Sequence, residues 1–291
     1  MLVIPIFVPH AGCPHDCCFC NQKIISGQTA LPDDKEIAGI IERFRPAAER
    51  YDEVQLAFYG GSFTAIDETL QLMFLKTVQP YLRKNGGFID TLRLSTRPDC
   101  IDADVIERLQ KYNVSVVELG AQSMDDNVLN ASGRGHLSND TETASELLLK
   151  NGFILGIQTM TGLPSATPES DIETAVKICS IMPDFVRIYP TVVVNGTALH
   201  RSFLNGKYIP PTVEEAVELC SILYKIYSSA GIKIVRMGLQ SSDNISNDGE
   251  IAAGPYHCAF GQLVRSHILL KKMIEKLNCC DGNICKSKAS V

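Results

Sequence analysis

The sequence predicts an α/β protein, namely a partial (β/α)6 TIM-like barrel of parallel strands with a short C-terminal helical extension. Short apolar runs alternate with segments of helical periodicity from the first residue onward. The apolar runs are nearly continuous, which is typical of parallel strands that are buried on both faces. Six such units are fewer than a complete eight-stranded barrel contains, so we expect a curved sheet that closes only part of the way.

The expected strands share an apolar, partly β-branched composition, and polar residues or glycine bound them. They are Leu2–Val8, Val54–Tyr59, Thr91–Ser95, Val114–Leu119, Ile154–Met160 and Phe185–Tyr189, with a short additional strand at Ile232–Met237.

Helices are expected between these strands. Ile37, Ile41 and Phe44 recur at the spacing of one helix face, and Asp33 is placed to cap the start of that helix. The same spacing recurs at Leu70–Val78, Val105–Tyr112 and Val213–Cys220. After about Gln240 the pattern weakens into a polar loop and one helix, Gln262–Leu277. We therefore expect a barrel over residues 1–240 and an extension over residues 241–291.

Composition narrows the possible classes of protein. With 45% hydrophobic residues, the chain can bury a sizeable core. No apolar run reaches the roughly 18–20 residues that span a bilayer, and Met1–Val8 lacks a basic leader, so we expect a cytoplasmic protein without membrane contact. A net charge of −6 argues against broad, sequence-independent adhesion to nucleic acid. Eleven cysteines in a chain of this kind favour metal binding or catalysis over disulfides.

Unusual residues follow the expected strands, where the ligand sites of parallel α/β folds lie. Cysteines follow the first strand and paired glycines follow the second. Single polar residues or a glycine follow the next three. In order, these are Cys13–Cys20, Gly60–Gly61, Arg97, Gln122 and Gly162.

Three cysteines, Cys13, Cys17 and Cys20, lie within eight residues of the first of these loops. Thiolates are the usual ligands of iron–sulfur clusters, and three ligands leave one iron of a four-iron cluster open to a cofactor or substrate. A structural zinc site is the alternative, because His10, His15 or Cys18 could supply a fourth ligand. If Cys18 replaced Cys17 as a ligand, only one residue would separate it from Cys20, which is too tight. We therefore expect Cys18 to pack against the protein or to lie behind the ligands.

The run Cys13–Cys20 resembles the radical S-adenosylmethionine (SAM) superfamily motif, which has an aromatic residue, here Phe19, before the last cysteine. The run Tyr59–Phe63 is similar to the glycine motif of that superfamily, and Gly60 and Gly61 would contact the methionine amino group of SAM. The resemblance therefore implies a [4Fe-4S] cluster on the three cysteines and SAM as the second cofactor. Phe19 falls among the implied cofactor-binding residues.

A closer resemblance, roughly from Val8 to Gly238, is to the catalytic subunit of Elongator, which modifies wobble uridine of tRNA. Oxygen-independent coproporphyrinogen III oxidase is similar more distantly. Four strings carry the resemblance. They are Ser95–Asp99, Glu118–Ser123, Arg134–His136 and Gly162–Pro164.

By position in these strings, the resemblance implies four further SAM contacts. Ser95 would lie beside the methionine amino group, Gln122 and Gln158 beside the ribose hydroxyls, and Arg134 beside the methionine carboxylate. The residue types suit these roles, because a carboxylate favours a guanidinium and hydroxyls favour an amide that donates and accepts. Ser95 and Gln158 replace acidic residues of the porphyrin enzyme, which favours the Elongator-like branch.

For several polar residues, two interpretations remain open. Glu118 and Arg187 lie in apolar strands, where an unpaired charge would be costly, so they either pair with each other or contact cofactor or substrate. Tyr189 and His136 could contact the substrate, although packing is the expected role of both. Residues 265–291 carry six Lys or Arg against two acidic residues, a segment that could meet RNA phosphates or form a solvated face. Cys279, Cys280 and Cys285 could bind a second metal.

The resemblance implies reductive cleavage of SAM at the cluster to a 5′-deoxyadenosyl radical, with a reductant such as flavodoxin or ferredoxin and tRNA as the candidate substrate. The chain leaves no room for the acetyltransferase-like domain of Elongator, which weakens the expectation of the same complete reaction. The alternatives are a radical SAM oxidoreductase that acts on a small molecule such as a tetrapyrrole precursor, and a non-catalytic iron–sulfur electron carrier. A pure carrier would favour four cysteine ligands and would not need the glycine pair, Gln122 or Arg134.

Overall fold

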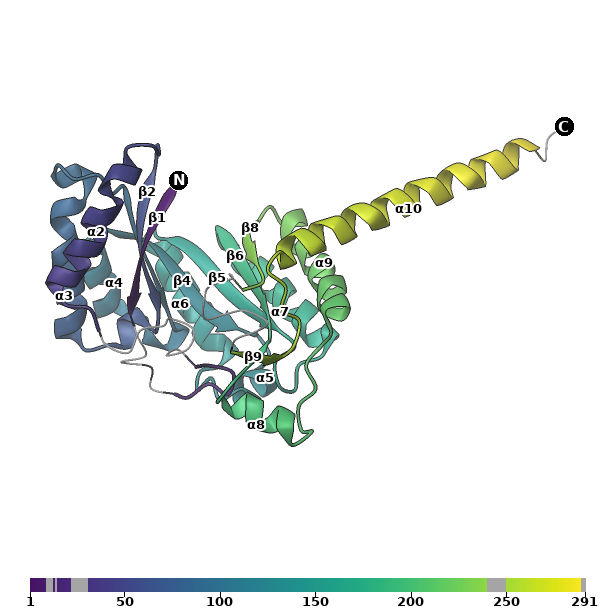
Figure 1. Cartoon of the computed structure of the whole chain (residues 1–291), viewed down its shortest axis with the longest axis horizontal. Coiled ribbons are helices and arrows are strands. Elements are labelled where there is room, and N and C mark those ends of the chain that lie inside the picture. Colours follow the sequence, from purple (N-terminus) through teal and green to yellow (C-terminus); the bar gives the residue numbers. More distant parts are fainter. Residues whose placement is uncertain (9–12, 14, 22–30, 240–249, 289–291) are drawn as a thin grey trace.

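The computed structural model describes residues 1–8, 13, 15–21, 31–239 and 250–288, with side chains described as far as residue 278. Within these residues a seven-stranded sheet is parallel throughout and runs in the order β1-β2-β3-β4-β5-β6-β8. Because β1 and β8 are its two edges, the barrel is open, and the predicted partial barrel is confirmed (Figure 1). The strands are β1 Leu2–Val8, β2 Val54–Gly60, β3 Thr91–Thr96, β4 Val114–Gln122, β5 Ile154–Thr161, β6 Phe185–Pro190 and β8 Lys233–Met237.

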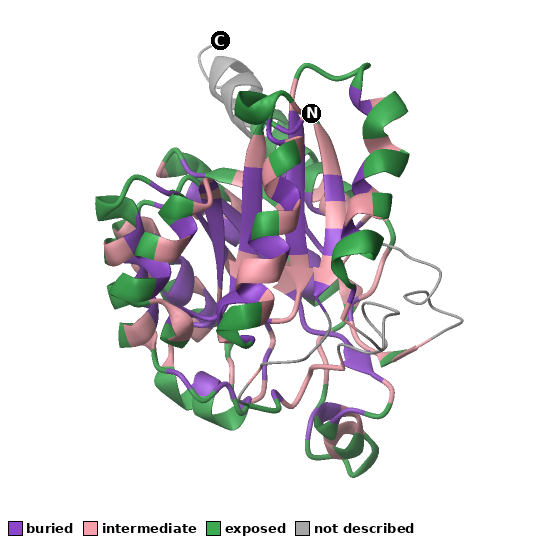
Figure 2. Cartoon of the chain, turned by 90° about the vertical axis from the view of Figure 1, so that its left-hand side faces the viewer, coloured by how far each residue is buried: buried purple, intermediate pink, exposed green. Residues whose placement is uncertain are grey.

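Helices follow the strands and cover the outer face of the curved sheet (Figures 1 and 2). The main ones are α2 Asp34–Ala48, α3 Glu68–Val78, α4 Ala103–Lys111, α6 Ser138–Lys150, α7 Pro168–Ile181 and α9 Val213–Ser229. Shorter ones are α5 Asp126–Ala131, α8 Ala198–Leu204 and the 3-10 turns η1 Phe63–Ala65, η2 Gln79–Tyr81, η3 Arg83–Asn85 and η4 Pro98–Cys100. Asp33 caps α2 as predicted, because its carboxylate accepts from Glu36 N at 2.8 Å.

Alternation along each strand divides the side chains between two environments. In β3, Leu92 and Leu94 are fully buried in the core under the helices, whereas Arg93 belongs to the opposite, interior face of the half-barrel. The interior face carries an unusual share of polar groups for a barrel, whose interior is ordinarily apolar. The open end of this interior lies where the loops that follow the strands gather.

The C-terminal region differs from the expectation in two ways. Val193–Val194 (β7) pairs antiparallel with Ile251–Ala253 (β9), a pairing too short to leave a periodic signal in the sequence. The predicted helix Gln262–Leu277 is longer and forms α10, Phe260–Lys288. The expected domain boundary at residue 240 falls outside the described residues.

Helix α10 begins in the main core and then projects away from the body of the protein (Figure 1). Phe260, Val264 and Ile268 are buried in the main core. Leu269 and Leu277, in the projecting part of the helix, are exposed. Lys271 forms an ion pair of 2.8 Å with Glu218 on α9. The side chains of Cys279, Cys280 and Cys285 lie outside those described. Among the helices described, none is long and apolar enough to cross a bilayer.

A buried carboxyl group holds the turn after β5. Asp171, in the first turn of α7, accepts a hydrogen bond from Gly162 N at 3.0 Å, and Tyr208 donates to Gly162 O at 2.6 Å. Gly162 has a positive φ of 69°, which suits glycine. Burial raises the pKa of Asp171 to about 7, although the Gly162 hydrogen bond opposes the rise.

Asp171→Asn is expected to make the protein more stable than wild type at pH 8 but not at pH 4. At any pH between 3.8, the ordinary pKa, and about 7, the folded-state pKa, Asp171 is ionised in the unfolded chain but still protonated in the folded protein. The free energy of unfolding of the wild type is therefore unaffected by this group below pH 3.8 and falls as the pH rises from 3.8 to about 7. Removing the ionisable group should recover up to about 4 kcal/mol.

Urea unfolding of both proteins at pH 4 and pH 8 measures this difference. Asp67→Asn is the matched control, since hydrogen bonds from Thr69 lower the pKa of Asp67, so the sign of its pH dependence is opposite. A pH-independent difference between Asp171→Asn and wild type would show that folding does not raise the pKa of Asp171.

Candidate functional site

The paired glycines join the ends of β1 and β2. Gly61 N donates to Val8 O at 2.8 Å, and Gly60 has a φ of 108°. A Cβ at residue 60 would lie 2.6 Å from Val8 O, so only glycine fits this turn. The cysteine loop begins directly after Val8, so the glycine pair lies beside the start of that loop, as the sequence predicts.

The three predicted cluster ligands lie in one loop and take part in no disulfide. Cys17 is buried, Cys13 and Cys20 are partly exposed, and Cys20 N donates to Cys17 O at 3.0 Å. In the described part of the chain, no three His, Cys, Asp or Glu side chains converge on the position of a single metal ion. A four-iron cluster does not require such convergence, because each thiolate binds a different iron atom. His10, considered for a zinc site, lies outside the described residues.

The loop that contains Arg134 supports the cysteine loop. Ser132 O accepts from Cys18 N at 2.9 Å. Gly135, with a φ of 71°, lies so close to His15 that a Cβ there would be 2.3 Å from the imidazole ring. The two loops therefore approach at backbone distance, and the glycine in the Arg134–His136 string permits that approach.

Arg134 connects the cysteine loop to β4. Its side chain is buried, with Nη1 3.3 Å from Cys17 Sγ and Nη2 2.5 Å from Gly120 O. Arg134 Nε has no hydrogen-bond partner among the described residues. Burial raises the pKa of the Cys13 thiol, while the Ser62 backbone N–H and the positive charges of Arg97 and Arg134 oppose that rise.

The two glutamines predicted to contact ribose lie together, Gln122 at the end of β4 and Gln158 within β5. Gln158 Nε2 donates to Gln122 Oε1 at 3.3 Å, and Gln122 has a positive φ of 67° where the β4–β5 register shifts. A Cβ on Gly120 would lie 2.9 Å from Gln122 Nε2 and 3.6 Å from Arg134 Nη2. Gly120, which the sequence analysis did not single out, thus leaves room for both Gln122 and Arg134.

Cys18 and Phe19 point toward a second, smaller hydrophobic cluster. Both pack against buried residues of β7, α8 and the loop after it, namely Val193, Leu199 and Tyr208. Leu199 N also donates to Cys18 O at 2.7 Å. The packing role expected for Cys18 is confirmed, and burial raises the pKa of its thiol to about 11. Phe19, assigned to the cofactor by resemblance, contributes to the same cluster.

Glu118 is the centre of a buried ion network inside the half-barrel. Its carboxylate lies 2.6 Å from Arg93 Nη2 and 2.6 Å from Arg187 Nε, the latter an ion pair without the alignment of a hydrogen bond. Arg187 also donates to the hydroxyl groups of Tyr59 and Tyr189, at 3.2 and 3.4 Å. The Glu118–Arg187 pair that the sequence left open is therefore present, and Arg93 is a partner that it did not indicate.

Ser95 and His136 are two further positions that the sequence analysis considered. Ser95 faces Glu118 across the β3–β4 register and is only partly buried. His136 is buried, as expected for a packed residue, and burial together with the charges of Arg134 and Arg97 lowers its pKa to about 3. The imidazole of His136 is therefore neutral at physiological pH.

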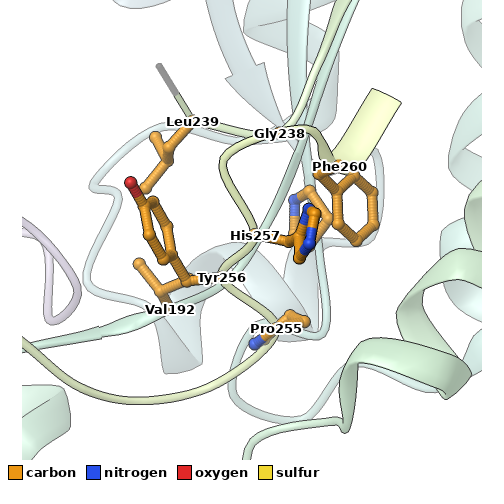
Figure 3. A pocket seen from close by; sticks show the side chains of 8 residues that line it. Val192, Gly238, Leu239, Pro255, Tyr256, His257 and Phe260 are labelled. Carbon is orange, nitrogen blue, oxygen red and sulfur yellow. The ribbon is translucent and has the colours of Figure 1, made fainter. Parts of the chain in front are cut away.

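A shallow depression lies where β6 and β8 end and α10 begins (Figure 3). The side chains of Tyr256, His257 and Phe260 stand around it, with Val192 and Pro255 below them. Gly238 has a φ of 79°, and a Cβ there would lie 2.6 Å from Phe260 Cβ, so glycine allows α10 to start against β8. The depression is thus an apolar surface at the same end of the sheet as the cysteine loop.

The described residues form an open parallel half-barrel with a cysteine loop after its first strand and a glycine turn after its second. The radical SAM superfamily model matches residues 7–178, and the radical SAM C-terminal domain model matches residues 183–269. The chain belongs to the radical SAM superfamily of enzymes.

Several curated relatives are similar to this chain. The tRNA uridine(34) acetyltransferase of Dehalococcoides mccartyi is 28% identical over 68% of this chain and 50% of its own length. The enzyme of the same name from Methanocaldococcus infernus is 27% identical over 75% of this chain and 48% of its own length. Elongator complex protein 3 of Mus musculus is 24% identical over 62% of this chain and 36% of its own length. The chain therefore spans about half the length, or less, of these relatives.

Solved structures share the fold. The archaeal Elp3 of Methanocaldococcus infernus superimposes with a TM-score of 0.74 at 23% identity, covering 93% of this chain and 63% of that one. Coproporphyrinogen III oxidase from Escherichia coli gives a TM-score of 0.58 at 16% identity, covering 79% of this chain and 53% of that one. The two families that the sequence resembles therefore both have this half-barrel.

Proposed function

We propose that this chain binds a [4Fe-4S] cluster through Cys13, Cys17 and Cys20 and cleaves SAM reductively to modify a uridine of tRNA. The observation that carries the proposal is the position of Arg134, which joins the buried thiol of Cys17 to the end of β4. The same end of the half-barrel holds the Gly60–Gly61 turn and the Gln122–Gln158 pair. When bound, the cluster would supply one electron to SAM, yielding methionine and a 5′-deoxyadenosyl radical.

The chain's own residues suit these ligands in charge and in hydrogen-bonding capacity. Arg134 Nε is a buried donor without a partner among the described residues, which suits a carboxylate such as that of methionine. Gln122 and Gln158 together offer donors and acceptors for ribose hydroxyls. The side chain of Ser95 and the turn at Gly60–Gly61 would lie beside the amino group. Phe19 would act by packing behind the cysteine loop.

The buried, neutral imidazole of His136 and the closely approaching loops would help to keep water from the cofactor site. The Glu118 network would form the floor of the cofactor site and hold the hydroxyl groups of Tyr59 and Tyr189 in place. A low-potential protein such as flavodoxin or ferredoxin would deliver the electron.

Formation of 5′-deoxyadenosine tests the first part of the proposal. Anaerobically reconstituted protein, given SAM and dithionite, is expected to hold about four irons and to release 5′-deoxyadenosine. A reconstituted protein that holds no cluster would refute the proposal, and one that holds a cluster with four cysteine ligands would favour the electron carrier.

The names of the relatives support tRNA as the substrate, and residues on the projecting helix suit an anionic partner. Arg265, Lys272 and Lys276 of α10 are basic, and α10 starts beside the end of the sheet that holds the site. Nucleoside mass spectrometry of tRNA from cells with and without the gene tests this part. We expect one modified uridine to disappear, and an unchanged profile would favour a small-molecule substrate such as a tetrapyrrole precursor.

A further inference from the structure

Arg97 is a buried cation that none of the roles above uses. It follows β3, and its side chain is 3% exposed. Its Nε and Nη2 atoms lie 2.9 Å from the two carboxylate oxygens of Asp99, a bidentate pair. Asp99 is more exposed than Arg97, at 22% of its side chain. The pair therefore places the positive charge on the protein side and the negative charge toward solvent.

Arg97 is connected through one residue to the cysteine loop. Its Nη2 donates to Arg134 O at 2.5 Å, and Arg134 Nη1 in turn lies 3.3 Å from Cys17 Sγ. Ser62, in the glycine turn, accepts from Arg97 N at 3.1 Å. Arg97 is thus attached both to the glycine turn and to the loop that supports the cysteines.

Both guanidinium groups keep an unused donor. Arg97 Nη1 and Arg134 Nε are buried and have no hydrogen-bond partner among the described residues. A buried donor without a partner is costly unless an acceptor or a negative charge lies near it. The thiolates of Cys13 and Cys17, together with the cluster that they would hold, provide that charge.

We infer that the Asp99–Arg97–Arg134 chain is a positioning and charge device that sets the reduction potential of the cluster. The inference rests on the proposed function, because it needs a cluster on the cysteine loop. Reduction adds one negative charge to the cluster, and nearby buried positive charge stabilises that state. Arg97 and Arg134 therefore raise the potential, and Asp99 offsets part of the effect of Arg97.

Two substitutions of opposite sign test this inference. Arg97→Gln removes one positive charge and is expected to lower the midpoint potential. Asp99→Asn removes one negative charge and is expected to raise it. We expect about a tenfold change in the one-electron equilibrium in each direction, which corresponds to about 59 mV. The double variant Arg97→Gln/Asp99→Asn, whose net charge equals that of wild type, should return close to the wild-type potential.

The measurement is an anaerobic redox titration of the reconstituted full chain without SAM, followed by the electron paramagnetic resonance signal of the reduced cluster. Iron and sulfide contents are matched before comparison. The control is Arg83–Asp90, a second Arg–Asp pair, which lies before β3 rather than after it. Arg83→Gln and Asp90→Asn should leave the potential unchanged.

The outcomes separate the inference from the proposed function. A purely structural role would move both single variants in the same direction or reduce their cluster content, and a shift of Asp99→Asn to lower potential, or no shift, overturns the inference. If Arg97→Gln holds no cluster, the sign of the Asp99→Asn shift alone decides. Wild-type protein without a cluster would refute the proposed function, whereas a cluster whose potential ignores both variants refutes only the inference.

Discussion

Cys17→Ala is expected to abolish cluster binding and 5′-deoxyadenosine formation. Cys17 is the most buried of the three predicted ligands, and Arg134 Nη1 lies 3.3 Å from its sulfur. Losing a group that merely orients a metal ligand costs roughly 10–100-fold. Losing a ligand itself should cost more, so we expect turnover to fall to the background without enzyme. Iron content and the yield of 5′-deoxyadenosine, measured on the same anaerobic preparation, check this result.

Cys18→Ala is the matched control from the adjacent position. Cys18 contributes its backbone to two hydrogen bonds, to Ser132 O and from Leu199 N, and alanine keeps both. Its side chain packs in the smaller hydrophobic cluster, so its loss should lower stability modestly and leave the iron content unchanged. A Cys18→Ala protein without a cluster, beside a Cys17→Ala protein with one, would reverse the ligand assignment.

The strands could be predicted well because buried parallel strands leave long apolar runs. β1 has the predicted bounds, Leu2–Val8. β4 was expected to stop at Leu119 but continues to Gln122, since it stays paired with β5 over Gly120–Gln122, a stretch too short in apolar residues to predict a strand. β7 and β9 contain two and three residues, so no periodicity could reveal them.

The site could be predicted as a set of residues but not as a set of contacts. Functional cysteines and glycines can be recognised from their spacing in the sequence, because few other residue types can replace them. The direction of a long side chain depends instead on how distant loops approach one another. Arg134 reaches Cys17 because its own loop lies against the cysteine loop, with Ser132 O bonded to Cys18 N and the His15 ring packed on Gly135. In the sequence, Arg97 is likewise only a polar residue that follows a strand. It is buried because the loops around it come together in the folded protein.

The contacts of Glu118 could likewise be predicted only in part. Its position in an apolar strand required an oppositely charged partner but did not identify every partner. A carboxylate in a buried strand needs an opposite charge, and Arg187 was the evident candidate. The β3–β4 pairing brings Arg93 to the other carboxylate oxygen as well. Two cations therefore share one anion, an arrangement that makes the network depend strongly on that single residue.

Glu118→Gln is expected to destabilise the half-barrel by about 3–5 kcal/mol, because it leaves two buried guanidinium groups without a counter-charge. The side chain of Glu118 is 5% exposed, and those of Arg93 and Arg187 are 8% and 17% exposed, so solvent compensates little of this loss. Chemical unfolding of the purified chain measures the change. Glu42→Gln, which removes the exposed partner of Arg45 on α2, is the control and should not change stability measurably.

A second substitution separates lost charge balance from lost packing. Arg93→Met in the Glu118→Gln background removes one of the two uncompensated charges while keeping most of the side-chain volume. If the cost of Glu118→Gln is electrostatic, this double variant should be more stable than Glu118→Gln alone, a coupling that a double-mutant cycle reveals. A double variant that loses stability further would show that Arg93 acts through its stacking over the Phe185 ring, 5.2 Å from its centre, rather than through Glu118.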